Sequence, residues 1–202
     1  MTVTSFKTVK LREGELIKTE FSDGSELSIS TVYLPEGIEA VFQENKELTL
    51  EEEEAFKFAA LCYGVEKAAL RYIARAEQNS LFLTAKLERK HPELVVKKVI
   101  SHLLDLNLIN NERYAELWVR SRLSQGKSPR WLLASLGKRG INRNSSLNAL
   151  KKVLDPETEY KLLLKYFEKI GVGEQESAAI PRARLKSEGF SNATLDRNFC
   201  IL

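Results

Sequence analysis

The residues in this sequence best suited to chemistry are cations, and they gather between Asn110 and Leu133. This stretch, NNERYAELWVRSRLSQGKSPRWLL, holds five arginines and lysines against two glutamates, with aromatic residues between them. A guanidinium group binds phosphate or carboxylate at two points because its donors form a planar fork. The stretch therefore indicates either a binding surface for an anionic partner or a solvated basic helix face.

The small net charge of the chain hides a strong asymmetry. The whole chain carries +3 at neutral pH, but residues 111–154 alone carry 10 basic and 2 acidic groups, a net charge of +8. Residues 1–60 are acidic, at −7, and the segments 61–110 and 155–202 carry +3 and −1. A local charge of this size steers anionic partners even when the average charge is small.

Catalytic and metal-binding residues do not form a recognisable motif. The sequence has no Gly-rich phosphate loop, no nucleophile elbow and no zinc or calcium signature. His91 and His102 lack companions at ligand spacing, while Cys62 is expected to be a small buried hydrophobic residue and Cys200 lies in the tail. We expect no enzyme, no cofactor and no metal. The lone cysteines and the absence of a signal peptide or a long apolar span predict a cytoplasmic protein without membrane segments.

The first 31 residues alternate as strands do. In ELIKTEFSDGSELSIS, a three-residue loop at 23–25 would pair Phe21 with Leu27 and Thr19 with Ile29 in a hairpin with a glycine bulge. From Leu48 the pattern is helical, and Thr49 with Glu52 forms a capping box. We expect Gly64 to break this region before a second helix over 65–76.

Beyond this point the chain repeats with a period of 49 residues. The period relates Leu87, Leu136 and Leu185, and it also relates Gly140 to Gly189. Each copy is expected to hold three helices, which in the second copy span about 111–125, 129–139 and 142–154. The predicted class is mainly α, with an extension over 1–47, a first repeat with a leading helix over 48–109, a basic repeat over 110–155 and a third repeat over 156–202.

The helix over 111–125 shows how the cations would be presented. Tyr114, Leu117, Trp118 and Ser121 follow helical spacing and are predicted to face inward, with the arginines on both flanks. The aromatic rings are therefore expected to be core residues more than exposed platforms for bases. Few acidic residues lie at neighbouring helical positions, which favours an anion supplied from outside the chain.

The predicted binding residues all belong to the second repeat. The helix that begins at Pro129, capped by Ser128, is also expected to turn its first amides toward an anion. The predicted surface consists of Arg113, Arg120, Arg122, Lys127, Arg130, Lys138, Arg139 and Arg143.

The same stretch resembles the RecX family of bacterial recombination regulators. The family's central signature reads here as Arg113-Tyr114-Ala115, Trp118-Val119, Arg120 with Arg122, Gly126-Lys127, Arg130, Leu132, Leu136 and Arg139-Gly140. The segment ALRYIARAEQNSLFLTAKLERK is similar to the family's first repeat. The segment FKTVKLREGELIKTEFSDGSELSIS is similar to the β-extension that some members carry.

The resemblance implies an elongated array of three tandem three-helix repeats, and we expect the protein to be a monomer. It implies binding to the RecA recombinase and its filament on single-stranded DNA, with inhibition of ATP hydrolysis and strand exchange, and hence a role in DNA repair and the SOS response. Some members bind DNA directly. The cations of the second repeat would then meet DNA phosphates or acidic side chains of the filament.

Two features depart from the family pattern. The first copy has His91-Pro92 where the other copies have Gly-Ile and Gly-Phe, and its third helix is shifted by about one residue. The third copy is acidic over 171–177, which argues against DNA contact there. The alternative is a helix-turn-helix-like, sequence-specific transcription regulator, because Asn142, Arg143 and Asn144 begin a helix that would suit base contacts. A third reading is a protein-interaction scaffold whose basic face meets an acidic protein.

Overall fold

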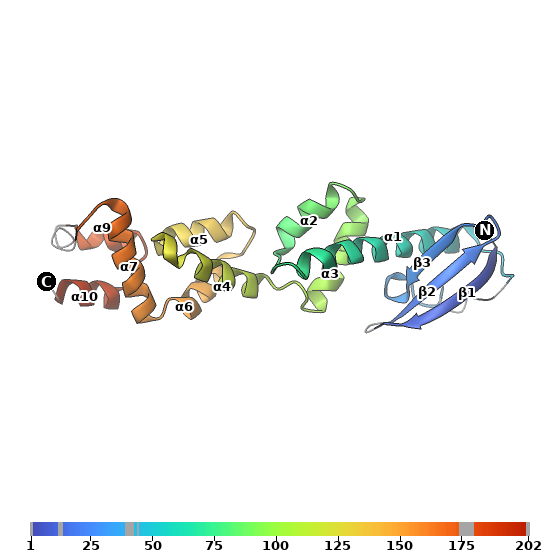
Figure 1. The fold of residues 1–202 in the computed structure, drawn as a ribbon, viewed down its shortest axis with the longest axis horizontal. Helices are drawn as coiled ribbons and strands as arrows, with labels where there is room; N and C mark the ends of the chain where they lie inside the picture. Colours follow the sequence, from blue (N-terminus) through green and yellow to red (C-terminus); the bar gives the residue numbers. More distant parts are fainter. Residues whose placement is uncertain (1, 12–13, 39–42, 44, 174–179, 201–202) are drawn as a thin grey trace. The chain divides into compact units, whose positions relative to one another are not determined.

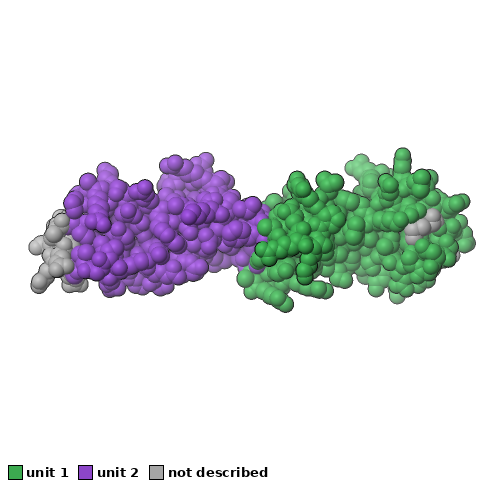
Figure 2. Space-filling view, turned by 90° about the horizontal axis from the view of Figure 1, so that it is seen from above, with its two compact units in different colours: residues 1–76, 83–109 green, residues 77–82, 110–202 purple. Residues whose placement is uncertain are grey.

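A computed structural model describes the whole chain except residues 1, 12–13, 39–42, 44, 174–179 and 201–202 (Figure 1). The chain forms two compact units, coloured separately in Figure 2. The first contains residues 1–76 and 83–109, and the second contains residues 77–82 and 110–202. Among the helices that the structure describes, none has both the length and the apolar content of a membrane span.

The first unit begins with a three-stranded antiparallel sheet. Its strands, in the order β1-β2-β3, are β1 (Val3–Lys10), β2 (Glu15–Phe21) and β3 (Glu26–Ser30), followed by a 3-10 turn η1 (Thr31–Tyr33). Phe21 and Ile29 are buried on the face that packs against helix α1 (Leu50–Ile73). The sequence predicted strands over the first 31 residues with a hairpin among them, and the structure confirms the hairpin and pairs β1 with its first strand.

The hairpin register differs from the prediction by two residues. Thr19 pairs with Leu27 and Ile17 pairs with Ile29, because the three-residue loop is Ser22–Gly24. Gly24 closes the loop with a φ of +80°, a conformation that glycine adopts without steric cost. A shift of two keeps every side chain on its original face, so these residues share one face as predicted although their partners differ.

Helix α1 contradicts the expected break at Gly64. The helix runs for 24 residues and begins at Thr49, whose side chain forms the predicted capping box with Glu52. Phe56, Ala59, Cys62, Val65 and Ala69 are buried along one continuous stripe that passes Gly64. Continuous burial of this stripe stabilises the helix by more than the roughly 1 kcal/mol that an interior glycine costs.

The free thiol of Cys62 belongs to this core. Its side chain is buried, and burial raises the pKa of the thiol to about 11, so it stays protonated at neutral pH. The prediction of a small buried hydrophobic residue is therefore confirmed. The core of the first unit is completed by helices α2 (Ser80–Glu88) and α3 (Glu93–Asp105). The side chain of Cys200 lies outside the described residues.

The second unit contains two further sets of helices. The first set is α4 (Asn111–Arg122) with the turn η3 (Leu123–Gln125), α5 (Pro129–Gly137) and α6 (Arg143–Val153). The second set is α7 (Pro156–Ile170), α9 (Arg182–Ser187) and α10 (Asn192–Cys200), and most of the acidic stretch over 171–177 lies outside the described residues. Helices α4, α5, α6 and α7 each follow an N-cap residue whose side chain accepts a hydrogen bond from the amide three residues later. These N-caps are Asn110, Ser128, Asn142 and Asp155.

The 49-residue period is real in three dimensions. Leu87, Leu136 and Leu185 are buried at equivalent positions of the middle helices α2, α5 and α9, as predicted. The third helices begin at residues 93, 143 and 192, so the first copy is shifted by one residue, also as predicted. His91 does not adopt the left-handed conformation of Gly140 and Gly189. The mainly α class with a small N-terminal sheet is therefore confirmed.

Successive repeats also meet through equivalent positions inside the second unit. A Cβ added to Gly140 would lie 2.9 Å from the side chain of Leu81, and one added to Gly189 would lie 3.2 Å from Arg130 and Pro129. Leu81 and Arg130 are themselves 49 residues apart. The carbonyl group of the residue before each glycine accepts a hydrogen bond from the preceding repeat. The side-chain amide of Asn79 donates to the Arg139 carbonyl, and the backbone amide of Arg130 donates to the Glu188 carbonyl. The period therefore specifies an interface as well as a fold.

Candidate anion-binding surface

The cationic surface is built on α4, which is turned differently from the prediction. Ala115, Trp118 and Val119 are buried, whereas Leu117 is 50% exposed. The inward face is thus rotated by about one residue, or roughly 100°, from the expected one. The reason is that α6 packs against the face of α4 that carries the small residue Ala115 and the β-branched residue Val119. The spacing of apolar residues in the sequence was compatible with both the predicted and the observed inward face of this helix.

Arg113 has an anionic partner within the chain. Its Nε and Nη2 atoms each donate to a carboxylate oxygen of Glu77 at 2.8 Å, and this pairing raises the pKa of Arg113. Lys152 similarly contacts Glu116 at 2.7 Å. The expectation that the anions must come from outside is therefore wrong for Arg113. Glu77 is 36 residues away in sequence, so a search of helical neighbours could not find it.

Arg122 and Arg139 pack over Trp118. The guanidinium carbons lie 5.5 Å and 4.6 Å from the ring centroid, distances at which a cation is attracted to the ring face. Arg139 also donates from Nη1 to the carbonyl oxygen of Ser135 at 3.1 Å. These two predicted residues hold the Trp118 ring in place. Both guanidinium groups therefore already have an interaction partner within the chain.

Trp131 is the aromatic residue that sequence reasoning missed. Its ring is stacked on Trp118 with a centroid separation of 5.9 Å and an interplanar angle of 20°, yet Trp131 is 38% exposed. The Nζ atom of Lys127 lies 4.7 Å from its centroid. An exposed ring beside an ammonium group can stack on a base while the ammonium binds the adjoining phosphate. The buried residues Leu132, Ser135 and Leu136 define the inward face of α5. The position of Trp131 next to this face is the sequence signal that could have identified it.

A second lysine from the third repeat joins this cluster. The neighbouring Lys127 ammonium is the main cause of a lowered pKa at Lys169, and desolvation adds to it. The Nζ atom of Lys169 donates to the carbonyl oxygen of Gln125 at 3.2 Å, which holds it beside the loop that carries Lys127. Two adjacent like charges repel each other, and an anion placed between them removes that repulsion. Lys127, Trp131 and Lys169 are called the Trp131 cluster below.

Four of the predicted cations project without internal partners. No described residue forms an ion pair or side-chain hydrogen bond with any of them, and they extend the positive surface of the second repeat over α4, α5 and the start of α6. These four are Arg120, Arg130, Lys138 and Arg143.

The beginning of α5 does not offer free amides. The Trp131 amide donates to Ser128 Oγ, the Arg130 amide donates to the carbonyl oxygen of Glu188, and Pro129 has no amide hydrogen. Ser128 Oγ also donates to the Glu188 carboxylate at 2.6 Å. The third repeat already supplies an anion here, so the expected anion site at this helix start is wrong.

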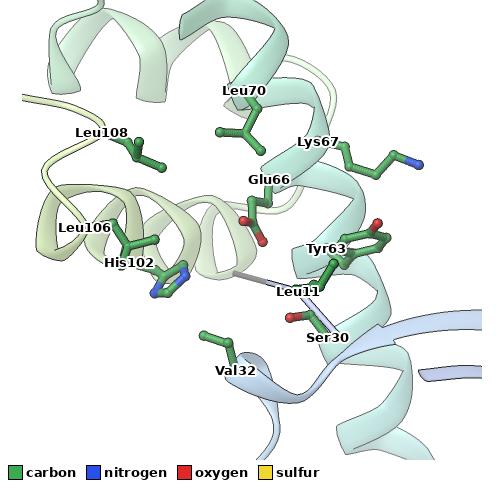
Figure 3. A pocket seen from close by; sticks show the side chains of 10 residues that line it. All are labelled: Leu11, Ser30, Val32, Tyr63, Glu66, Lys67, Leu70, His102, Leu106 and Leu108. Carbon is green, nitrogen blue, oxygen red and sulfur yellow. The ribbon is translucent and has the colours of Figure 1, made fainter. Parts of the chain in front are cut away.

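A separate cavity of about 320 Å3 lies in the first unit between α1, α3 and the end of the sheet (Figure 3). Glu66 and His102 point into it, among mainly apolar side chains. The Tyr33 hydroxyl donates to Glu66 at 3.0 Å, and burial next to this carboxylate raises the pKa of Tyr33. The carboxylate makes this cavity a poor site for an anion.

Comparisons with known proteins agree with this arrangement. A family model described as RecX, second three-helix domain, matches residues 110–147, the repeat that carries the cations. Regulatory protein RecX of Treponema pallidum subsp. pallidum is 32% identical over 115 residues, covering 56% of this chain and 70% of that protein. Regulatory protein RecX of Mycolicibacterium smegmatis is 37% identical over 86 residues, covering 42% and 45%.

Solved structures share the fold. The crystal structure of a regulatory protein RecX covers 98% of both chains with a TM-score of 0.68 at 20% identity. RecX from Lactobacillus salivarius gives a TM-score of 0.54 at 26% identity, covering 70% of this chain and 96% of that one. The repeats and their cationic surface define a tandem three-helix-repeat protein. Together with the sequence relatives, they show that the chain belongs to the RecX family of regulatory proteins.

Proposed function

We propose that this protein regulates the RecA recombinase by binding the filament that RecA forms on single-stranded DNA, and that it lowers the filament's ATP hydrolysis. Membership of the RecX family supports RecA as the partner. The observation that carries the mode of binding is the set of second-repeat cations without a partner among the described residues, together with the Trp131 cluster. Its groups suit an anionic strand, because they combine phosphate-binding charge with a flat ring.

The contact residues of this proposal have different roles. Arg120, Arg130, Lys138 and Arg143, together with Lys127, bind the anionic partner directly. Arg122 and Arg139 hold Trp118 beneath Trp131, and Arg113 shares its charge with Glu77. The binding residues are thus a subset of the cations that the sequence indicated. The role of a transcription regulator is less favoured, because the Asn142 side chain caps α6 by accepting from the Ser145 amide at 2.8 Å.

The test is RecA-dependent ATP hydrolysis on single-stranded DNA, titrated with this protein. We expect the rate to fall as the protein is added, and direct binding to RecA-coated strands should track the fall. A rise in rate would keep RecA as the partner and contradict inhibition. An unchanged rate with no binding would contradict the proposed function itself.

A further inference from the structure

A second group of cations, in the first unit, surrounds a cavity of about 270 Å3. The end of α1 and the residues just after it supply two arginines, and the end of α2 and the residues just after it supply two lysines and a histidine. No acidic residue is among the described residues that line the cavity. The polar lining consists of Arg71, Arg75, Lys86, Lys90 and His91, and the remainder is Ala68, Tyr72 and Leu87.

The two helix ends bring both pairs of charges to the same cavity. Arg71 lies in the last turn of α1 with Arg75 just after the helix, and Lys86 lies in the last turn of α2 with Lys90 just after it. Neither an ion pair nor a side-chain hydrogen bond joins Arg71, Arg75 or Lys90 to a residue that the structure describes. Lys86 lies over the Tyr72 ring, with Nζ 5.2 Å from the centroid.

Helix dipoles do not account for this much positive charge. Basic residues are common at helix C-termini, where the dipole is equivalent to about −0.5 of an elementary charge. The two helix ends here therefore offset only about one of the four permanent charges. Glu88, at the end of α2, is not among the residues that line the cavity. The three charges of Arg71, Arg75 and Lys90 alone therefore exceed what the two helix dipoles offset.

The chemistry of the lining specifies a phosphate group attached to a flat ring. Paired arginines bind two phosphate oxygens at once, and lysine ammonium groups neutralise the remaining charge. Tyr72, which is 36% exposed, adds an aromatic surface at the edge of the cavity. The volume lies just below the usual range for small-molecule pockets, about 300–1,000 Å3, which suits a single nucleotide unit better than a large cofactor.

We propose that the cavity formed by Arg71, Arg75, Lys86, Lys90 and His91 is a nucleotide-phosphate site. It is separate from the second repeat's cations and needs no RecA to be occupied. The phosphate belongs either to a phosphodiester of single-stranded DNA or to a free nucleoside triphosphate.

The chain carries its own reporter for this site. It has two histidines, of which His91 lines the cationic cavity and His102 lines the separate cavity of the first unit. The full chain, labelled at its histidine rings, is titrated by NMR with inorganic pyrophosphate at constant pH. We expect the His91 resonances to move in a saturable way while those of His102 stay in place. No movement of His91, or equal movement of both, would overturn the proposal.

Variants show whether the lining residues cause the shift. Arg75→Gln with Lys90→Gln removes two charges just beyond the helix ends, and we expect the apparent Kd for pyrophosphate to rise about tenfold or more. Lys10→Gln with Lys18→Gln is the matched control, because it removes the same charge from exposed positions of the sheet in the same unit. An equal rise in the apparent Kd for both pairs of variants would show that pyrophosphate responds to the overall positive charge of the unit. That outcome would contradict the proposal. Arg71→Gln is the reserve variant if melting curves show that the double variant is unstable.

The source of the phosphate is then decided by two further ligands. A short thymidine oligonucleotide and ATP are titrated separately, again following His91 against His102. Movement of His91 at lower oligonucleotide concentration identifies a strand site, and movement at lower ATP concentration identifies a free-nucleotide site. Because no RecA is present, failure of this experiment leaves the proposed regulation of RecA untouched, and the reverse also holds.

Discussion

The second and third repeats have the same three-helix arrangement but differ in how their charged side chains are paired. In the third repeat, Arg182 contacts Asp196 and Arg197 contacts Glu157, both at 2.6 Å. In the second repeat, Arg120 and Arg130 have no such partner among the described residues. At one equivalent position the sign is reversed, since Arg139 of the second repeat corresponds to Glu188 of the third. The shared core specifies the fold, and the surface positions are free to specify the partner.

The buried anion of the third repeat sharpens this contrast. Glu159 is buried and accepts hydrogen bonds from the Ser191 amide at 2.8 Å and from the Thr194 hydroxyl at 2.7 Å. It therefore holds the start of α10 against α7. The third repeat uses an acidic residue for its own architecture, while Arg120, Arg130, Lys138 and Arg143 of the second repeat have no acidic partner among the described residues.

The largest expected effect tests whether Leu136 and Leu185 occupy equivalent positions in the core that the two repeats share. Leu136→Ala and Leu185→Ala should each lower the free energy of unfolding by about 2–5 kcal/mol, because each removes a fully buried side chain from a middle helix. Chemical denaturation of both variants measures this. A cost near zero at one position would show that its repeat does not share the common core.

The next effect tests whether the two repeats differ in binding. Arg120→Ala with Arg130→Ala should weaken binding to RecA-coated or bare single strands by about 1–3 kcal/mol. If phosphate is the partner, the dependence of log K on log salt should fall by about two units, one for each lost contact. Titrations at two salt concentrations, beside a melting curve, measure both quantities.

The third repeat provides the control for that experiment. Arg182→Ala with Arg197→Ala removes the same charge but breaks two exposed ion pairs, which contribute about 0–1 kcal/mol each to stability. Binding should be unchanged and the melting temperature slightly lowered. The opposite result, with weaker binding only for this pair, would move the anion-binding surface to the third repeat.

The smallest effect concerns the first helix of each repeat in acid. The Thr158 amide donates to Asp155 at 2.8 Å and holds the pKa of that carboxyl below its ordinary value of 3.8. A lowered pKa stabilises the folded state above pH 3.8, and this contribution is lost as pH falls through the folded-state pKa. Asn110, the equivalent cap of α4, has no titrating group.

Asp155→Asn should therefore keep the cap and reduce the loss of stability in acid. Denaturation midpoints of the wild type and the variant, measured from about pH 5 down to about pH 2, make the comparison. Asn110→Asp is the reciprocal variant and should introduce an additional acid-dependent loss. Identical pH profiles for all three proteins would mean that these caps do not couple to folding.

Some features of the fold could be read from short segments because their causes are local. Ser128 followed by Pro129, and Thr49 with Glu52, mark helix starts through contacts within one turn. The period of Leu87, Leu136 and Leu185 marks the middle helices because one structural unit recurs. The predicted helix break at Gly64 was wrong. The free energy that one interior glycine costs is small compared with the stabilisation from burying a whole helical stripe.

The sequence by itself determined the repeat, the helix starts and the cationic character of the second repeat, because each depends on neighbouring residues or on a recurring pattern. Only the tertiary structure decided which cations are available. Glu77 pairs with Arg113, Arg139 packs over Trp118, and Lys169 lies beside Lys127, although these partners lie far apart or on separate helices. The cavity between α1 and α2 likewise exists only once two helix ends meet. Charge is a property of composition, but the pairing of charges depends on distance in space.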